Sequence, residues 1–337
     1  MTETLVEQGP DGGLARSGAS PPAGSLWTGG LFAGALWLAL AALVALWPNR
    51  RPWAFTEELA AAFALAALAL AAAAVGPRLT GRRPARLERS GPWLIAAAVA
   101  LAAWEVATAK LDLLPVPFFA PPQALVEVFT EDYLRLATSL LHSLALLATG
   151  YGVGAVVGFV TGVSIGWSRS VAYWVHPVLR LLGPLPPTAL LPLTFFFLPT
   201  SWSAGVFLIA LATWFPVTVL TASGVASVNR NLYDVARTLG ADERFLVLKV
   251  AVPAALPQVF VGLFMGLGAS FTVLVTAEMM GVKAGLGFYL QWAQGWASYA
   301  NMYAALLVMA VTFSGIITLL FRARDRVLSW QKGIVKW

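Results

Sequence analysis

The chain has 337 residues, of which 59% are hydrophobic and 11% are charged, and its formal net charge is +6. Soluble globular domains carry roughly 25% charged residues, so this composition predicts a polytopic, all-α integral membrane protein in a lipid bilayer. The absence of cysteine excludes disulfides, thiolate catalysis and cysteine-based metal sites. Most basic residues flank apolar runs, a pattern that argues against nucleic acid as a partner.

Residues 1–25 are rich in Gly, Pro and Ser and place no basic cluster before a short apolar core. We therefore predict a disordered cytoplasmic tail and not a cleavable signal peptide. Apolar runs of close to the roughly 20 residues that cross a bilayer then recur along the chain. They predict about eight membrane-spanning helices, near 26–47, 58–75, 93–108, 139–167, 180–198, 203–225, 256–277 and 302–321.

The parts between the spans differ in composition. An amphipathic helix is expected at 124–136, and a Gly-rich, aromatic connection at 278–300. The predicted organisation is a tail at 1–25, two N-terminal spans with a basic cytoplasmic loop at 26–91, a transmembrane domain at 92–322 that includes a polar segment at 229–253, and a basic cytoplasmic end at 323–337.

The basic residues test how the spans alternate between the two sides of the membrane. If the amino terminus is cytoplasmic, all but five of the 22 lysines and arginines fall on the cytoplasmic side. The exceptions are Arg50, Arg51, Lys110, Arg135 and Lys283. The positive-inside rule thus predicts that both termini and the polar segment 229–253 are cytoplasmic.

Glycine recurs at every fourth position in the span 139–167. The members of this glycine stripe are Gly150, Gly154, Gly158, Gly162 and Gly166. Such spacing puts glycines on one helix face, where another helix backbone can approach closely. Tight packing is the favoured interpretation, and a flexible hinge is the alternative.

The same run contains Gly162-Val-Ser-Ile-Gly166, which matches the G-x-S-x-G pattern of serine hydrolases. An intramembrane serine protease would then use Ser164 with His142 or His176 as its base. The hydrolase serine sits on a sharp strand-to-helix turn, whereas Ser164 lies in a continuous apolar run. A helix-packing serine is therefore the preferred interpretation.

Four prolines between Gly183 and Pro192 predict an irregular start to the span 180–198. Two interpretations stay open: a broken helix that faces a translocation pathway, and a kink with only a structural role. Glu105 and Glu278 fall at predicted span ends, where solvation at the membrane interface is expected. No carboxylate is expected near the middle of a span, which weakens the case for an ion-coupled secondary transporter. No arginine embedded in a span marks an anion site.

The polar segment 229–253 carries seven charged side chains, yet apolar residues recur through it at helical spacing. This pattern predicts a surface helix, an interruption at Gly240 where φ > 0 is allowed, and a second short helix through Phe245 and Val250. A phosphate loop of the form G-x-x-x-x-G-K-[ST] is absent from the sequence. If ATP drives this protein, another subunit must bind it.

This segment resembles the cytoplasmic loop of the membrane-spanning permease subunits of bacterial ABC importers, which carries E-A-A-x-x-x-G, nine residues, and then I-x-L-P. Here Asp234-Val235-Ala236, Gly240 and Val250-Ala-Val252-Pro253 keep that spacing. Asp replaces Glu, Val replaces the first Ala, and Val stands at both the Ile and the Leu positions.

The resemblance covers about residues 93–335 and is closest to the nitrate/sulfonate/taurine/bicarbonate branch. The stretches that carry it are Trp104-Glu105, Leu113-Leu-Pro-Val-Pro, Leu141-His-Ser-Leu, Thr276-Ala-Glu-Met-Met-Gly and Gly285-Leu-Gly287. It implies a six-span core, to which this chain adds two N-terminal spans.

The family implies a transporter subunit of the bacterial inner membrane that is not itself an enzyme and holds no cofactor. Its expected partners are a second permease subunit in a homodimer, two ATP-binding subunits that hold ATP and Mg²⁺, and an extracytoplasmic substrate-binding protein. The expected solute is a small oxyanion: nitrate, a sulfonate such as taurine, or bicarbonate. The alternatives are an ion-coupled secondary transporter and, less favoured, the serine protease.

Two sets of residues follow from this resemblance. The residues expected to couple to the ATPase are Asp234, Val235, Ala236, Arg237, Gly240, Val250, Val252 and Pro253. The residues expected along the translocation path are Pro187, Thr194, Thr213, Thr218, Thr272 and Glu278, with Ser143 and Thr161. An amphipathic helix lying on the membrane surface is the alternative for the polar segment.

Overall fold

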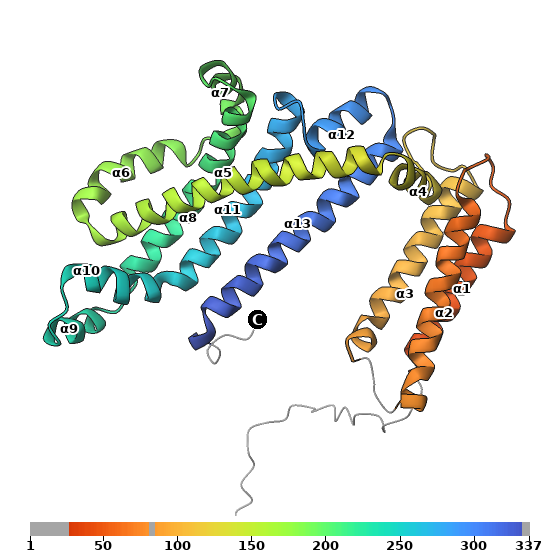
Figure 1. Ribbon diagram of the computed structural model, residues 1–337, viewed down its shortest axis with the longest axis horizontal. Coiled ribbons are helices and arrows are strands. Elements are labelled where there is room, and N and C mark those ends of the chain that lie inside the picture. Colours follow the sequence, from red (N-terminus) through yellow and green to blue (C-terminus); the bar gives the residue numbers. More distant parts are fainter. Residues whose placement is uncertain (1–26, 81–84, 332–337) are drawn as a thin grey trace, which may run out of the picture. The chain divides into compact units, whose positions relative to one another are not determined.

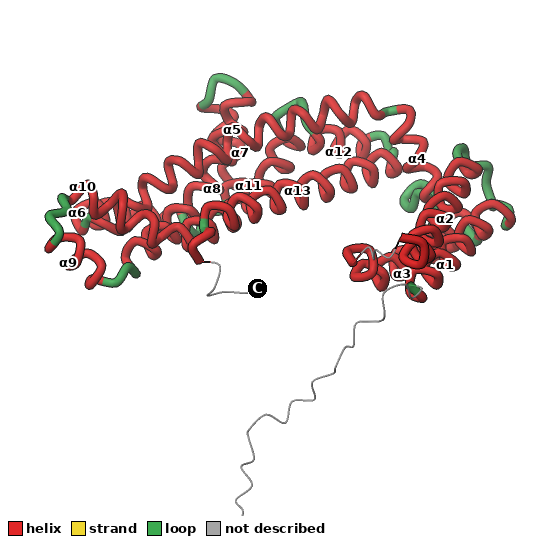
Figure 2. Tube along the Cα trace, turned by 60° about the horizontal axis from the view of Figure 1, so that its bottom comes forward, coloured by secondary structure: helices red, strands yellow, loops and turns green. Residues whose placement is uncertain are grey.

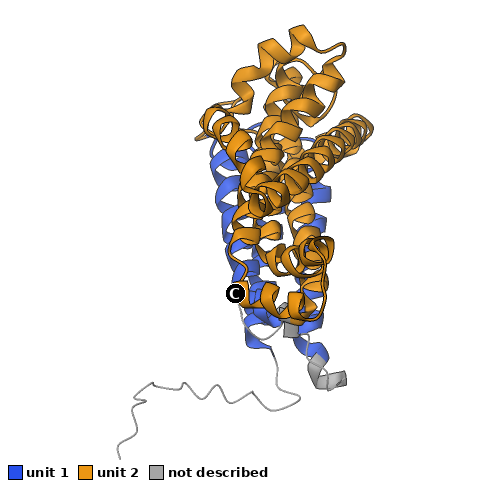
Figure 3. Cartoon of the chain, turned by 90° about the vertical axis from the view of Figure 1, so that its left-hand side faces the viewer, with its two compact units in different colours: residues 1–112 blue, residues 113–337 orange. Residues whose placement is uncertain are grey.

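The computed structural model describes residues 27–80 and 85–331 and divides the chain into two compact units, residues 1–112 and 113–337 (Figures 1 and 3). Every regular element of the described residues is helical (Figure 2), which confirms the all-α prediction. The predicted tail 1–25, residues 81–84 of the basic loop and residues 332–337 of the predicted basic end lie outside the described residues.

The first unit is built from α1 (Thr28–Leu46), α2 (Thr56–Thr80) and α3 (Ala85–Glu105), which a π-helical segment η1 (Val106–Lys110) extends. Both α2 and α3 pack against α1. Small side chains allow this close approach, and Ala33 and Ala74 are completely buried. This unit ends at residue 112 and not at 91, because α3 packs on α1.

A buried ion pair closes one end of the first unit. The Lys110 ammonium lies 3.5 Å from the Glu105 carboxylate, and their side chains are 0% and 1% exposed. Lys110 Nζ donates to the carbonyl oxygens of Val44 at 2.9 Å and Trp47 at 2.6 Å, and to Asn49 Oδ1 at 2.8 Å. It thereby satisfies carbonyls that the end of α1 leaves without helical partners. The expected solvation of Glu105 is wrong, because η1 turns Lys110 inward beside it.

The second unit holds the remaining helices. They are α4 (Pro122–Glu131), α5 (Tyr133–Trp167), α6 (Arg169–Leu182), η2 (Pro187–Leu190), α7 (Leu191–Phe197), α8 (Ser201–Ala226), α9 (Arg230–Thr238), α10 (Glu243–Phe245), η3 (Leu246–Ala251), α11 (Val252–Met280), α12 (Leu286–Gly295), α13 (Tyr299–Val327) and η4 (Ser329–Gln331). The amphipathic helix expected at 124–136 is α4, and it ends earlier, at Glu131.

The glycine stripe of α5 lies against the backbone of α8, which confirms the packing interpretation. A Cβ atom at Gly158 would lie 2.9 Å from the Trp214 carbonyl oxygen, and one at Gly162 would lie 2.7 Å from that of Thr218. The same offset recurs at the end of the stripe. Because contacts advance by four residues on both helices, α5 and α8 run in the same direction.

Two parallel helices need a return between them, and residues 168–200 supply it. As the chain advances, Leu179 faces Ala222, Gly183 meets the Phe215 ring, and Leu191 shares a core cluster with Leu208. This path therefore runs back along α8, from one end of the unit to the other. It is a crossing, and α6 and the η2–α7 pair meet in it at 84°.

The broken crossing refines the predicted span 180–198. Seven helices of the described chain are long and apolar enough to span a membrane, and counting the bent pair as one span gives eight. The crossing begins at Arg169, and not at 180, because α6 is a helix of 14 residues where a link was expected. Prolines at 184, 186 and 187 interrupt the helix after it, since proline lacks the N–H and disfavours the α conformation before it.

The other long helices of this unit alternate in direction. Gly262 and Gly266 of α11 face Pro216 and Thr213 of α8 in reverse order. Rings of α11 and α13 stack in reverse order as well, with Phe264 on Phe321 and Phe271 on Phe313. The polar segment 229–253 and the end of α13 consequently share one end of the second unit (Figure 1).

Replacing Lys110 with methionine should destabilise the first unit. Lys110→Met keeps the volume but leaves the Glu105 carboxylate buried without its cation, which typically costs about 3–5 kcal/mol. We expect the thermal midpoint of the purified chain to fall, and the double variant with Glu105→Gln to recover part of the loss. Lys283→Met, at an exposed lysine, is the control; an equal midpoint for the two single variants would contradict the account.

A large side chain in the glycine stripe should separate α5 from α8. Gly162→Leu places its Cβ against the Thr218 carbonyl, and such overpacking costs about 1–3 kcal/mol or more. Gly152→Leu on the same helix is the control, because no atom lies within 4 Å of that position. We expect a lower fraction of monodisperse protein after heating for Gly162→Leu alone; equal fractions would argue against the close contact.

Candidate functional site

The polar segment 229–253 folds as a helix, a left-handed glycine turn and a second helix, as predicted. Asn229 Oδ1 accepts from the backbone N of Asn231 at 3.0 Å, and α9 follows. Gly240 then adopts φ +85°, a region that side chains disfavour. Asp242 Oδ1 accepts from the backbone N of Phe245 at 2.8 Å at the start of α10. Each turn of the segment is therefore fixed by its own local hydrogen bonds.

The outer surface of this segment combines apolar and charged side chains. Leu232, Val235 and Leu239 are 52%, 60% and 83% exposed. Arg237 bridges the glycine turn, because its guanidinium lies 3.9 Å from Asp234 on one side and 3.3 Å from Glu243 on the other. Exposed apolar side chains set among charges are typical of a surface that binds another protein.

The inner surface connects the segment to the long helices. Ala251 and Ala255 form a buried cluster with Val225 at the end of α8, and Tyr233 packs against that cluster. The Tyr233 ring also meets the Trp167 ring of α5 edge-on at 5.5 Å. Burial raises the pKa of Tyr233. A displacement of α9 would therefore reach the ends of both α5 and α8.

The eight residues predicted to couple to an ATPase divide between these two surfaces. Asp234, Val235, Arg237 and Gly240 are exposed, and Ala236 is half-buried. The others, Val250, Val252 and Pro253, are half-buried where η3 enters α11. The sequence analysis missed Tyr233 and Trp167, although both are large aromatic residues at the ends of apolar runs.

Glu278 pins the turn after α11 to α5. Its Oε1 accepts from the Ser143 hydroxyl at 2.6 Å and its Oε2 from the backbone N of Gly287 at 2.7 Å. Ser143 Oγ in turn accepts from the backbone N of Leu286 at 2.8 Å. Glu278 is 1% exposed, so its expected solvation at the interface is wrong. The carboxylate is buried because backbone and hydroxyl donors replace water.

Thr161 accepts from Trp214 Nε1 at 3.2 Å, and the other predicted path residues fall into two groups. Thr194, Thr213 and Thr218 are buried and hydrogen-bond within the helix packing. Pro187 and Thr272 line a hollow of about 490 Å³ beside the prolines of the broken crossing, with Phe215 and Met265. We call this the proline hollow.

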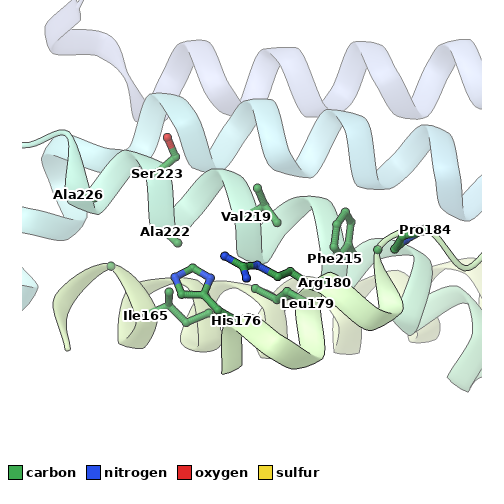
Figure 4. Close-up of a pocket in the computed structure, with 12 residues that line it drawn as sticks. Ile165, His176, Leu179, Arg180, Pro184, Phe215, Val219, Ala222, Ser223 and Ala226 are labelled. Carbon is green, nitrogen blue, oxygen red and sulfur yellow. The ribbon is translucent and has the colours of Figure 1, made fainter. Parts of the chain in front are cut away.

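A second hollow of about 700 Å³ lies between α6 and α8 (Figure 4). His176 and Arg180 of α6 project into it, and Phe215, Val219 and Ala222 lie on its α8 side. We call this the α6–α8 hollow. Gly183 and Phe215 line both hollows, so the two meet at that contact.

The serine protease alternative finds no support in the surroundings of Ser164. This residue lies inside the continuous helix α5, and its hydroxyl donates to the Val160 carbonyl oxygen at 2.7 Å. His142 Nδ1 contacts the Thr138 carbonyl oxygen of its own helix at 2.8 Å. A serine that bonds its own helix turn lacks the exposed elbow geometry of a hydrolase nucleophile.

Comparisons with known proteins agree on one family. Residues 127–331 match the family described as binding-protein-dependent transport system inner membrane component. A probable ABC transporter permease protein of Brucella abortus is 30% identical over 74% of this chain and 98% of its own length. A Bacillus subtilis permease named for aliphatic sulfonates transport is 29% identical over 71% of this chain and 87% of its own.

A nitrate import permease protein of Synechococcus elongatus is 25% identical over 72% of this chain and 89% of its own length. The match to the family includes α5, the broken crossing, the polar segment and α13. The chain therefore belongs to the family of binding-protein-dependent transport system inner membrane components, the multi-pass permease subunits of ABC transporters in bacterial inner membranes.

Proposed function

We propose that this chain is the permease subunit of an ATP-driven importer that takes up a small oxyanion: nitrate, a sulfonate such as taurine, or bicarbonate. The names of the sulfonate and nitrate relatives support this class of solute. The observation that carries the proposal is the polar segment itself. It keeps the family's spacing around Gly240, exposes apolar residues and packs on the ends of α5 and α8.

The polar segment would seat in a cleft of an ATP-binding subunit. Leu232, Val235 and Leu239 would be covered there, and Arg237 would keep the turn in shape through its contacts with Asp234 and Glu243. Closure of the ATP-binding subunits would then push on α9 and, through Tyr233, on α5 and α8. Aspartate in place of the family's glutamate shortens the carboxylate arm but keeps its charge.

The complete transporter would contain two copies of this chain as a homodimer, two ATP-binding subunits that hold ATP and Mg²⁺, and an extracytoplasmic substrate-binding protein. This chain would hold no cofactor. Both termini and the polar segment would face the cytoplasm. The common end shared by the polar segment and α13 is compatible with that topology, since basic residues concentrate in both.

Substitution of Gly240 should uncouple ATP hydrolysis from uptake. Proline cannot adopt φ +85° and removes the N–H that donates to the Arg237 carbonyl at 2.9 Å, and tryptophan adds bulk at the docking surface. A residue held at such a φ costs about 1–3 kcal/mol. We expect Gly240→Pro and Gly240→Trp to insert normally and to lower vesicle uptake at least about tenfold.

Gly240→Asn is the matched control, because asparagine tolerates the left-handed region better than other side chains do. The space around position 240 is open within 4 Å, so this variant should retain most uptake. Normal uptake by both the proline and the tryptophan variants would contradict a role of Gly240 in coupling ATP hydrolysis to uptake.

A further inference from the structure

Arg180 lies inside the crossing and not at its edge. The sequence places this residue beside a link, but the crossing begins at Arg169, so Arg180 sits about 16 Å along the axis of α6 at ~1.5 Å per residue. The next turn, Gly183, packs on Phe215 near the middle of α8. Arg180 thus lies within the bent pair of helices, and its side chain is exposed. Ionisable side chains at such depth mark functional sites more often than structural ones.

The surroundings of Arg180 provide positive charge without a compensating acid. His176 lies one helical turn away, and both side chains project from α6 toward α8 (Figure 4). The described residues that line the α6–α8 hollow include no aspartate or glutamate. Most of the other lining residues are apolar, among them Ile165, Leu179 and Val219. Both basic side chains are exposed in the structure, so an anion can reach the guanidinium.

The hollow also connects to the break in the crossing. Its lining shares Gly183 and Phe215 with the proline hollow, which contains Pro187 and Thr272. A Cβ atom at Gly183 would lie 2.8 Å from the Phe215 ring, so the ring fits only because position 183 is glycine. The two hollows are thus successive spaces along one crossing, with Phe215 between them.

We propose that the α6–α8 hollow is a binding station for a small oxyanion, in which the Arg180 guanidinium holds the ligand and His176 adds a second polar group beside it. Phe215 on Gly183 separates this station from the proline hollow. The planar guanidinium suits nitrate, sulfonate and bicarbonate oxygens alike, because it donates from two nitrogens at once. The proposal rests on the proposed function for its solute class.

The natural absence of cysteine gives a direct test. In the assembled transporter, Ala222→Cys gives this chain one thiol, on the α8 side that faces His176 and Arg180. We would measure its reaction rates with anionic sulfonatoethyl methanethiosulfonate and with cationic trimethylammonioethyl methanethiosulfonate. Arg180→Gln in this background should lower the anionic-to-cationic rate ratio by about tenfold or more, and Arg180→Lys should retain most of it. Arg326→Gln, at the end of α13, is the charge-matched control and should leave the ratio unchanged.

Oxyanion binding is tested by whether the oxyanion protects the thiol from the methanethiosulfonate reagents. Sodium nitrate, methanesulfonate and bicarbonate should slow the reaction at position 222 when Arg180 is present and not in Arg180→Gln, whereas sodium chloride at the same ionic strength should slow it less. An unchanged rate ratio in Arg180→Gln would mean that the guanidinium extends away from the hollow, and it would overturn the proposal. A changed ratio without protection by any of the three oxyanions would mean that Arg180 only attracts anions through its charge and does not bind them. That result would also overturn the proposal.

Measurement of solute uptake tests whether the station is used during transport. Arg180→Gln should lower the maximal uptake rate by about tenfold, with the half-saturating solute concentration unchanged if the binding protein sets it, and Arg180→Lys should restore part of the rate. Unaltered uptake by Arg180→Gln would contradict the station. The thiol rates require no transport, so failure of the importer assignment and failure of this station give different results.

Discussion

The contact between the glycine stripe of α5 and the backbone of α8 is the constraint on which the second unit depends. Five glycines spaced four residues apart let the two helices touch along most of their length, and the contacts advance in the same direction on both. Parallel neighbours cannot be joined by a short turn. The chain must recross between them, and it does so through a segment that proline has broken into two helices bent by 84°. Irregular backbone at that depth survives where protein or a water-filled cavity covers it.

This arrangement brings together the two parts of an importer that have to communicate. The polar segment packs through Tyr233 and Ala251 on the ends of α5 and α8, and η2 and α7 of the broken crossing pack on the same α8. A push on α9 would therefore reach the helix that forms one wall of both hollows. Glu278 provides a fixed point at the other end of α5, since its hydrogen bonds to Ser143 and Gly287 hold the turn between α11 and α12.

Much of this was predictable from the sequence, and what was missed has a physical cause. The eight crossings, the glycine packing and the left-handed Gly240 follow from local patterns of apolar residues and glycine, which act over one or two helical turns. The burial of Glu105 and Glu278 was not predictable, because it depends on partners such as Lys110 and Ser143 supplied by tertiary contacts. Arg180 was missed for a related reason: residues 168–179 read as a polar link, and only the helix α6 brings His176 and Arg180 onto one side, toward α8. Arg180 and His176 are also four residues apart, and that spacing was the available signal.

Uptake by the reconstituted transporter tests whether ATP hydrolysis drives import of a small oxyanion through this permease. Proteoliposomes would contain this chain and its ATP-binding subunit, with the binding protein outside, and labelled nitrate, taurine and bicarbonate would be offered in turn. We expect one of these solutes to accumulate only when ATP and Mg²⁺ reach the ATP-binding subunit, and ionophores that collapse the proton and sodium gradients to leave the rate unchanged. Accumulation that persists without ATP and disappears with the ion gradient would contradict that expectation.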